Sequence, residues 1–145
     1  MADRLRDGRD LAEGNVEYIN VLAAAAASWA FGAVWYMALA KPWMAAAKIA
    51  VGAGGRPTNA SPLPFVLSAI CMILVAGLLR HVMAMSNLTS VFQGLMAGFG
   101  VGAFFISPWI MINNAYGQRP FTLTLIDGGY ATIGCSLIGL VLALF

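Results

Sequence analysis

Apolar side chains dominate four long stretches of the chain, at approximately residues 18–40, 63–79, 88–112 and 123–145. Each stretch is close to the roughly 20 residues that an α-helix needs to cross about 30 Å of hydrocarbon. None of them alternates polar and apolar positions as a membrane β-strand does, and a backbone in lipid must satisfy its own hydrogen bonds. The pattern therefore predicts four membrane-spanning helices.

Turn-forming or charged residues separate these stretches, namely Lys41-Pro42, Arg80-His81 and Gly117-Gln118-Arg119-Pro120. The connection at 41–62 opens with an Ala-rich segment. We expect its residues 42–51 to form a short helix in the membrane interface, with Trp43 and Met44 turned inward. The predicted fold class is all-α: an integral membrane four-helix bundle with a short interfacial helix between spans 1 and 2.

Composition agrees with a membrane protein. Of the 145 residues, 61% are hydrophobic and 10% are charged, and the mean hydropathy is +0.82. A soluble domain of this size needs more polar surface, which excludes a secreted disulfide scaffold, a nucleic-acid-binding domain and a catalytic domain standing in water. Because charges concentrate before Tyr18, we expect a charged, solvent-exposed tail at 1–17 and a single four-span membrane domain at 18–145.

Four spans place both termini on the same side of the membrane. The basic residues of the spans' connections and tail are divided equally: Arg4, Arg6, Arg9 and Arg80 on the side of the termini, and Lys41, Lys48, Arg56 and Arg119 on the other. Acidic residues accompany the arginines of the tail, whereas the first connection is purely basic. This favours an orientation with both termini outside the cytoplasm.

Small residues recur every four positions in three of the predicted spans. These rows are Ala24, Ser28 and Gly32 in the first span, Gly94, Gly98 and Gly102 in the third, and Ala131, Cys135 and Gly139 in the fourth. Small residues let helices in lipid approach closely. Packing within one chain is the favoured interpretation, and a contact between subunits is the alternative. We expect contact with membrane lipids and either a homo-oligomer or membership of a larger membrane complex.

Most polar side chains of the spans collect at one end, where the first and third spans finish and the fourth begins. The candidate pocket or ion-pair cluster at this end consists of Trp35, Tyr36, Lys41, Trp109, Asn113, Asn114, Arg119, Asp127 and Tyr130. Two interpretations compete. The cluster forms a polar pocket for an ion, lipid headgroup or small solute, or it is an ion pair that holds three helices together.

Asp127 is the single acidic residue after position 17. It follows Pro120 by seven positions, which at 1.5 Å per residue places it about 10 Å along the fourth helix. A carboxylate at that depth needs a partner, and Arg119, Lys41 and the two asparagines are the predicted ones.

The third span contains Pro108, directly after Ser107. Proline lacks a backbone N–H and crowds the preceding turn, so we expect the helix to kink or end there.

Sequence motifs for metal binding or catalysis are weak. His81, Met83 and Met85, with Cys71 two turns earlier, have the soft ligands of a copper(I) site, but methionine in apolar helices usually serves packing. The chain has no Cys-x-x-Cys, His-Glu-x-x-His or Gly-x-Ser-x-Gly motif. We therefore expect neither a metal nor a cofactor, and a protein that is not an enzyme.

Several of these residues together resemble a bacterial family of small membrane proteins defined as domain of unknown function number 1761. The matching residues are Ile19-Asn20, Gly32, Trp35-Tyr36, Lys41, Trp43-Met44, Asn113-Asn114, Arg119-Pro120 and Ile126-Asp127-Gly128-Gly129-Tyr130. The resemblance covers most of residues 18–145 and implies four membrane helices, without implying an activity. It also implies a multi-pass protein of the bacterial cytoplasmic (inner) membrane.

Two functional hypotheses follow. The first is a structural or accessory subunit that acts through helix–helix assembly, with its glycine-lined helices against a partner. The second is a small-solute or ion carrier or binding protein whose polar pocket, around Asp127, opens at one membrane face.

Overall fold

The computed structural model describes the backbone of residues 2–145 and the side chains of residues 18–145. In chain order the elements are α1 (Ala2–Ala38), α2 (Ala40–Ala46), α3 (Leu63–Met85), α4 (Val91–Val101), the π-helical turn η1 (Gly102–Ile106), α5 (Ser107–Tyr116) and α6 (Phe121–Leu142). The described part of the chain contains one isolated bridge, between Val51 and Pro57, and no strand. The all-α prediction is confirmed.

Four helical segments are long and apolar enough to cross a membrane: Tyr18–Ala38, Leu63–Met85, Val91–Tyr116 and Phe121–Leu142. The predicted number of spans is therefore confirmed, and the largest boundary difference is in the second. We expected that span to end at residue 79, but α3 continues to Met85 because Arg80 and His81 are compatible with a helix. The helix ends just before Asn87, whose φ of 52° leaves the helical region.

The predicted interfacial helix exists but is displaced towards the N-terminus. It was expected at 42–51, and α2 instead begins at Ala40, one residue after α1, and ends at Ala46. Pro42 is tolerated because it stands in the first turn, where its missing N–H is not needed. Lys48, with a φ of 57°, turns the chain out of the helix.

The residues of the predicted tail at 2–17 are the first part of the same helix as the first span.

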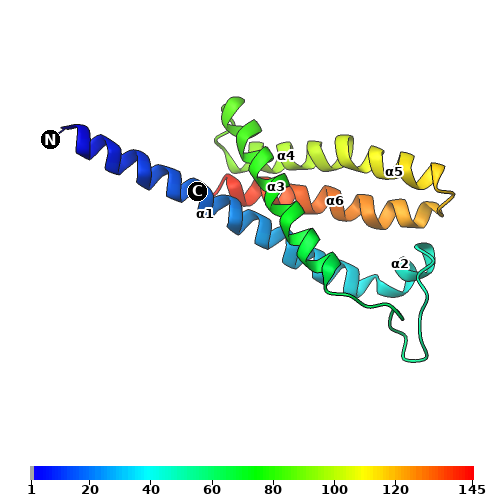
Figure 1. The fold of residues 1–145 in the computed structure, drawn as a ribbon. Coiled ribbons are helices and arrows are strands. Elements are labelled where there is room, and N and C mark those ends of the chain that lie inside the picture. Colours follow the sequence, from blue (N-terminus) through cyan, green and yellow to red (C-terminus); the bar gives the residue numbers. More distant parts are fainter. Residues whose placement is uncertain (1) are drawn as a thin grey trace.

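The last helix, α6, is the centre of the bundle. It contacts α1, α2, α3, α4, η1 and α5. Figure 1 shows α6 between α1 and the α4–α5 segment, with α3 crossing obliquely. At one end of the bundle the Asn20 side chain donates a 3.4 Å hydrogen bond to the carbonyl of Phe145, so the start of the first span and the C-terminal residue are neighbours.

Glycines allow α4 and α6 to pack backbone against backbone. A Cβ atom on Gly98 would overlap the carbonyl group of Cys135, and one on Gly94 would overlap the carbonyl oxygen of Gly139. A Cβ atom on Gly102 would lie 2.5 Å from the Ala131 carbonyl oxygen. The two small-residue rows of the third and fourth spans thus face each other within one chain.

The small-residue row of the first span also packs on α6. Ala24 is fully buried, and a Cβ atom on Gly134 of α6 would lie 2.8 Å from Ser28 Oγ. A Cβ atom on Gly32 would lie 2.8 Å from the Tyr130 ring. All three rows are therefore used within the chain, which was the favoured of the two interpretations of their spacing.

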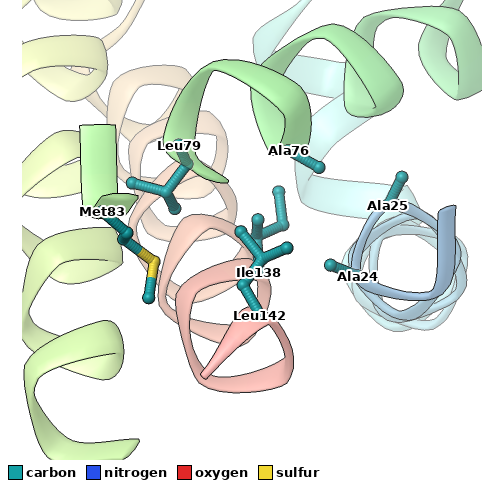
Figure 2. Packing of buried hydrophobic residues seen from close by; sticks show 7 residues of the cluster. All are labelled: Ala24, Ala25, Ala76, Leu79, Met83, Ile138 and Leu142. Carbon is teal, nitrogen blue, oxygen red and sulfur yellow. The ribbon is translucent and has the colours of Figure 1, made fainter. Parts of the chain in front are cut away.

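Apolar side chains form a compact core at the end of the bundle that holds Asn20 and Phe145. Figure 2 shows its members: Ala24 and Ala25 from α1, Ala76, Leu79 and Met83 from α3, and Ile138 and Leu142 from α6. Met83 is 1% exposed within this core, whereas Met85 is 73% exposed. Met83 and Met85 therefore lack the common face that a copper(I) site with His81 would require.

The third span does not end at Pro108 but stays helical through it. A π-helical turn, η1, precedes α5, and the helix continues to Tyr116. The Ser107 N–H donates to the Gly102 carbonyl, and the Ser107 hydroxyl lies 2.7 Å from the same oxygen. The wider turn accommodates the proline, because these extra contacts satisfy backbone groups that a regular helix would leave without partners.

Candidate functional site

Asp127 lies in the second turn of α6 and receives hydrogen bonds from two aromatic side chains. The Tyr36 hydroxyl donates to Asp127 Oδ1 at 2.9 Å, and the Trp43 indole N–H donates to the same oxygen at 3.1 Å. Tyr36 comes from the end of α1 and Trp43 from α2. The short α2 helix thus turns an interfacial tryptophan back over the start of α6.

The predicted partners of Asp127 are wrong. Arg119 instead donates to the carbonyl of Ala47 at 3.1 Å, and Asn114 donates to the Thr124 hydroxyl at 3.1 Å. Lys41 and Asn113 are exposed. Long cationic side chains near a helix end reach the interface readily, whereas the short Asp127 side chain contacts only its immediate neighbours on α1 and α2.

The nine-residue cluster predicted from the sequence therefore divides. Trp35, Tyr36 and Tyr130 lie with Asp127 at the contact between α1 and α6, and Trp35 donates a 3.0 Å hydrogen bond to the Ile126 carbonyl. Trp109, which is 59% exposed, points away, as do Lys41, Asn113 and Arg119. Asn114 holds α5 to α6 through Thr124.

Aromatic rings form a continuous row beside Asp127. Tyr36 contacts Trp43 with ring centroids 5.5 Å apart and Tyr130 with centroids 5.3 Å apart. Phe31 stacks on Tyr130 at 6.2 Å and contacts Trp35 at 5.7 Å. Phe31 and Trp43 were not among the candidate site residues. The i, i+4 spacing of Phe31 and Trp35 on one helix face is the sequence pattern from which this row could have been predicted.

A partly open cavity of about 220 Å³ lies between the four spans, next to Asp127. It is lined by Ser28 and Tyr36 of α1, Met72 and Val75 of α3, Ile106 of η1, Ile110 of α5, and Asp127, Tyr130, Ala131, Gly134 and Cys135 of α6. Most of the wall is apolar. The contributions of α3 and η1 were not predicted, because no pattern in the sequence indicates which face of these apolar helices turns inward.

The hydroxyl groups in this cavity are already engaged. The Ser28 hydroxyl lies 3.5 Å from Met72 Sδ, and the Tyr130 hydroxyl lies 3.4 Å from the same sulfur. Asp127 differs, because both of its hydrogen bonds reach Oδ1 and its second oxygen accepts none from residues 18–145. Among the polar side chains that line this largely apolar cavity, Asp127 is therefore the one with an oxygen that no hydrogen bond from residues 18–145 occupies.

Four apolar helices, with α6 in the centre of the other three and with Asp127 between them, define the class of the molecule: a multi-pass membrane protein. The chain belongs to the family described as Protein of unknown function (DUF1761), whose model matches residues 19–143. The match covers the four spans, the connections between them and the site around Asp127. No curated protein and no solved structure matches the chain.

Proposed function

We propose that this chain is a non-enzymatic membrane protein that binds or carries a small solute or ion, and that its binding site is the cavity beside Asp127. The observation that carries the proposal is the position of this cavity, which all four spans line and which one carboxylate borders. Ionisable residues within membrane spans are expensive to bury and mark functional sites more often than structural ones.

The sequence favoured helix–helix assembly over binding, and we take the contacts of the glycines as support for the opposite order. The small-residue rows that favoured assembly are occupied by contacts among α1, α4 and α6. The cavity, in contrast, does not improve packing. A larger side chain at one of its walls would fill it and gain dispersion contacts, so packing alone does not explain its presence.

A thermal-shift experiment in mild detergent tests this proposal. The probes are a panel of small amines, carboxylates, sugars, Na⁺ and K⁺. A ligand of the native state raises the apparent melting temperature. We expect at least one probe class to stabilise the wild type and not Val75→Phe, which fills the cavity from α3.

The matched control is Leu74→Phe, on the same helix but 67% exposed. It should respond to the probes as the wild type does. A panel in which no probe shifts the wild type, or shifts wild type and Val75→Phe equally, would overturn the proposal.

Assembly remains as a second candidate function, through a different surface. The outer face of α3 carries large exposed side chains, namely Phe65, Val66, Leu67, Ile70, Ile73, Leu74 and Leu78. This face suits a second copy or another membrane helix as well as lipid. Native mass measurement of the particle extracted in mild detergent distinguishes these cases: a fixed stoichiometry above one chain supports assembly, and a single chain with lipid opposes it.

We further propose that the protein resides in the bacterial cytoplasmic membrane with both termini outside the cytoplasm. The support is the end of the bundle that carries Lys41, Lys48, Arg56 and Arg119, all exposed and without an acidic residue in the connections. Basic connections are retained on the cytoplasmic side.

A further inference from the structure

We propose that the ligand of the cavity is an amphipathic organic cation: an ammonium group seated against Asp127 and the rings of Tyr36 and Tyr130, with an apolar substituent along the rest of the wall. This inference rests on the proposed binding function and names its ligand class. Charge, aromatic geometry and the composition of the wall each support it.

Asp127 has no counter-charge among residues 18–145. Both of its hydrogen-bond donors, Tyr36 and Trp43, are neutral, and it forms no ion pair with any residue of 18–145. The nearest cations in the sequence, Lys41 and Arg119, are exposed at the end of the bundle. A carboxylate in a membrane span is stabilised by a paired positive charge, so a cationic ligand supplies a charge that no residue of 18–145 supplies.

Aromatic rings lie beside the carboxylate on the wall of the cavity. Tyr36 and Tyr130 line the cavity together with Asp127, and their centroids are 5.3 Å apart at an interplanar angle of 63°. The contact between them is edge-to-face, and the negative π face of such a ring attracts a cation within about 6 Å of its centroid. The polarizable sulfur of Met72, which also lines the cavity, adds a soft contact.

The wall of the cavity does not suit a bare inorganic cation. Such an ion needs about six oxygen ligands, and the wall offers four oxygen-bearing side chains: Ser28, Tyr36, Asp127 and Tyr130. Three of them direct their hydroxyls at other protein atoms. The apolar contribution of Val75, Ile106 and Ile110 instead suits a hydrocarbon substituent.

Benzyltrimethylammonium is the probe, and neopentylbenzene, its neutral isostere with carbon in place of nitrogen, is the matched comparison. Binding to the full chain in detergent is measured for wild type and Asp127→Asn. The amide preserves size and an oxygen acceptor for Tyr36 and Trp43, and removes only the charge. We expect the substitution to raise the Kd of the cation at least about tenfold and to leave the isostere unaffected. Partition of the probes into detergent is the same for both proteins.

A second pair of variants covers the case in which Asp127→Asn does not fold. Tyr130→Phe keeps the ring and should hold the Kd of the cation within about threefold, whereas Tyr130→Leu removes the π face and should weaken binding about fivefold or more. Equal loss in both variants would count against the aromatic contact.

The outcomes separate this inference from the proposed function. Binding of the isostere as tightly as the cation, or no effect of Asp127→Asn on the cation, overturns the ligand class and leaves the binding function intact. Displacement of the cation by millimolar Na⁺ or K⁺ identifies an inorganic ion instead. If neither these probes nor the panel binds in a Val75-dependent manner, both proposals fail.

Discussion

The Tyr36 hydroxyl donates a 2.9 Å hydrogen bond to Asp127 Oδ1, joining the end of the first span to the start of the fourth across 91 positions of the chain. Trp43 reaches the same oxygen from α2. One carboxylate oxygen thus ties three helices together with neutral donors, while the second oxygen accepts no hydrogen bond from residues 18–145. The contact is at once structural and a candidate for binding, and its two roles can be tested separately.

Asp127→Leu should destabilise the protein more than Asp127→Asn. The amide oxygen still accepts from Tyr36 and Trp43, whereas leucine leaves both partly buried donors without their acceptor, at a cost of about 1–3 kcal/mol. Apparent melting temperatures in detergent, followed by tryptophan fluorescence, provide the measurement. A large loss of stability in Asp127→Asn would show that the charge itself holds the helices, and the pocket would lose its main support.

Gly98→Ala should loosen the contact between α4 and α6. The added methyl group meets the Cys135 carbonyl, so the helices must separate, at a cost of about 1–3 kcal/mol. Gly100→Ala, in the same helix, is the control, since a Cβ atom there has no neighbour within 4 Å. Thermal unfolding in detergent should show a lower midpoint for Gly98→Ala and an unchanged or slightly higher one for Gly100→Ala. Equal midpoints would contradict the close packing.

Ser107→Ala should weaken the π-helical turn and its contact with α6. The Ser107 hydroxyl lies 2.7 Å from the Gly102 carbonyl and 3.0 Å from that of Gly128, and with one hydrogen it donates to one of them at a time. Loss of such a bond within a membrane costs about 1 kcal/mol. Ser136→Ala is the control, because within residues 18–145 the Ser136 hydroxyl donates only to the Thr132 carbonyl of its own helix. A melting temperature lowered equally in both variants would argue against a special role of Ser107.

Cysteine labelling in intact cells tests the orientation. In a background with Cys71→Ala and Cys135→Ala, we expect Ser86→Cys, after α3, to react with a membrane-impermeant maleimide from outside. Ala53→Cys, in the basic connection between α2 and α3, should react only after permeabilisation. Both positions are exposed, and neither change alters a charge. The opposite result would reverse the orientation, and labelling of both from the same side would contradict the span between them.

Hydropathy was sufficient to predict the four spans, because a long apolar segment in lipid has few alternatives to a helix. The exact ends were less predictable. Arg80 and His81 were predicted to end the second span, but they lie inside α3, since charged residues near a membrane interface do not break a helix. The row of Gly94, Gly98 and Gly102 predicted close helix packing, but the spacing alone did not indicate that α6 would be the partner helix.

At the candidate site, the sequence predicted the position of the carboxylate but not its partners. That Asp127 is the single carboxylate beyond the tail, and that it lies inside a helix, is a property of the linear chain. Its partners are not, because they depend on how α2 folds back and on which face of α1 meets α6. Composition and hydropathy act on each segment independently and therefore define the spans, whereas the choice of Tyr36 and Trp43 over Arg119 and Lys41 depends on distances between segments. Only packing in three dimensions sets those distances.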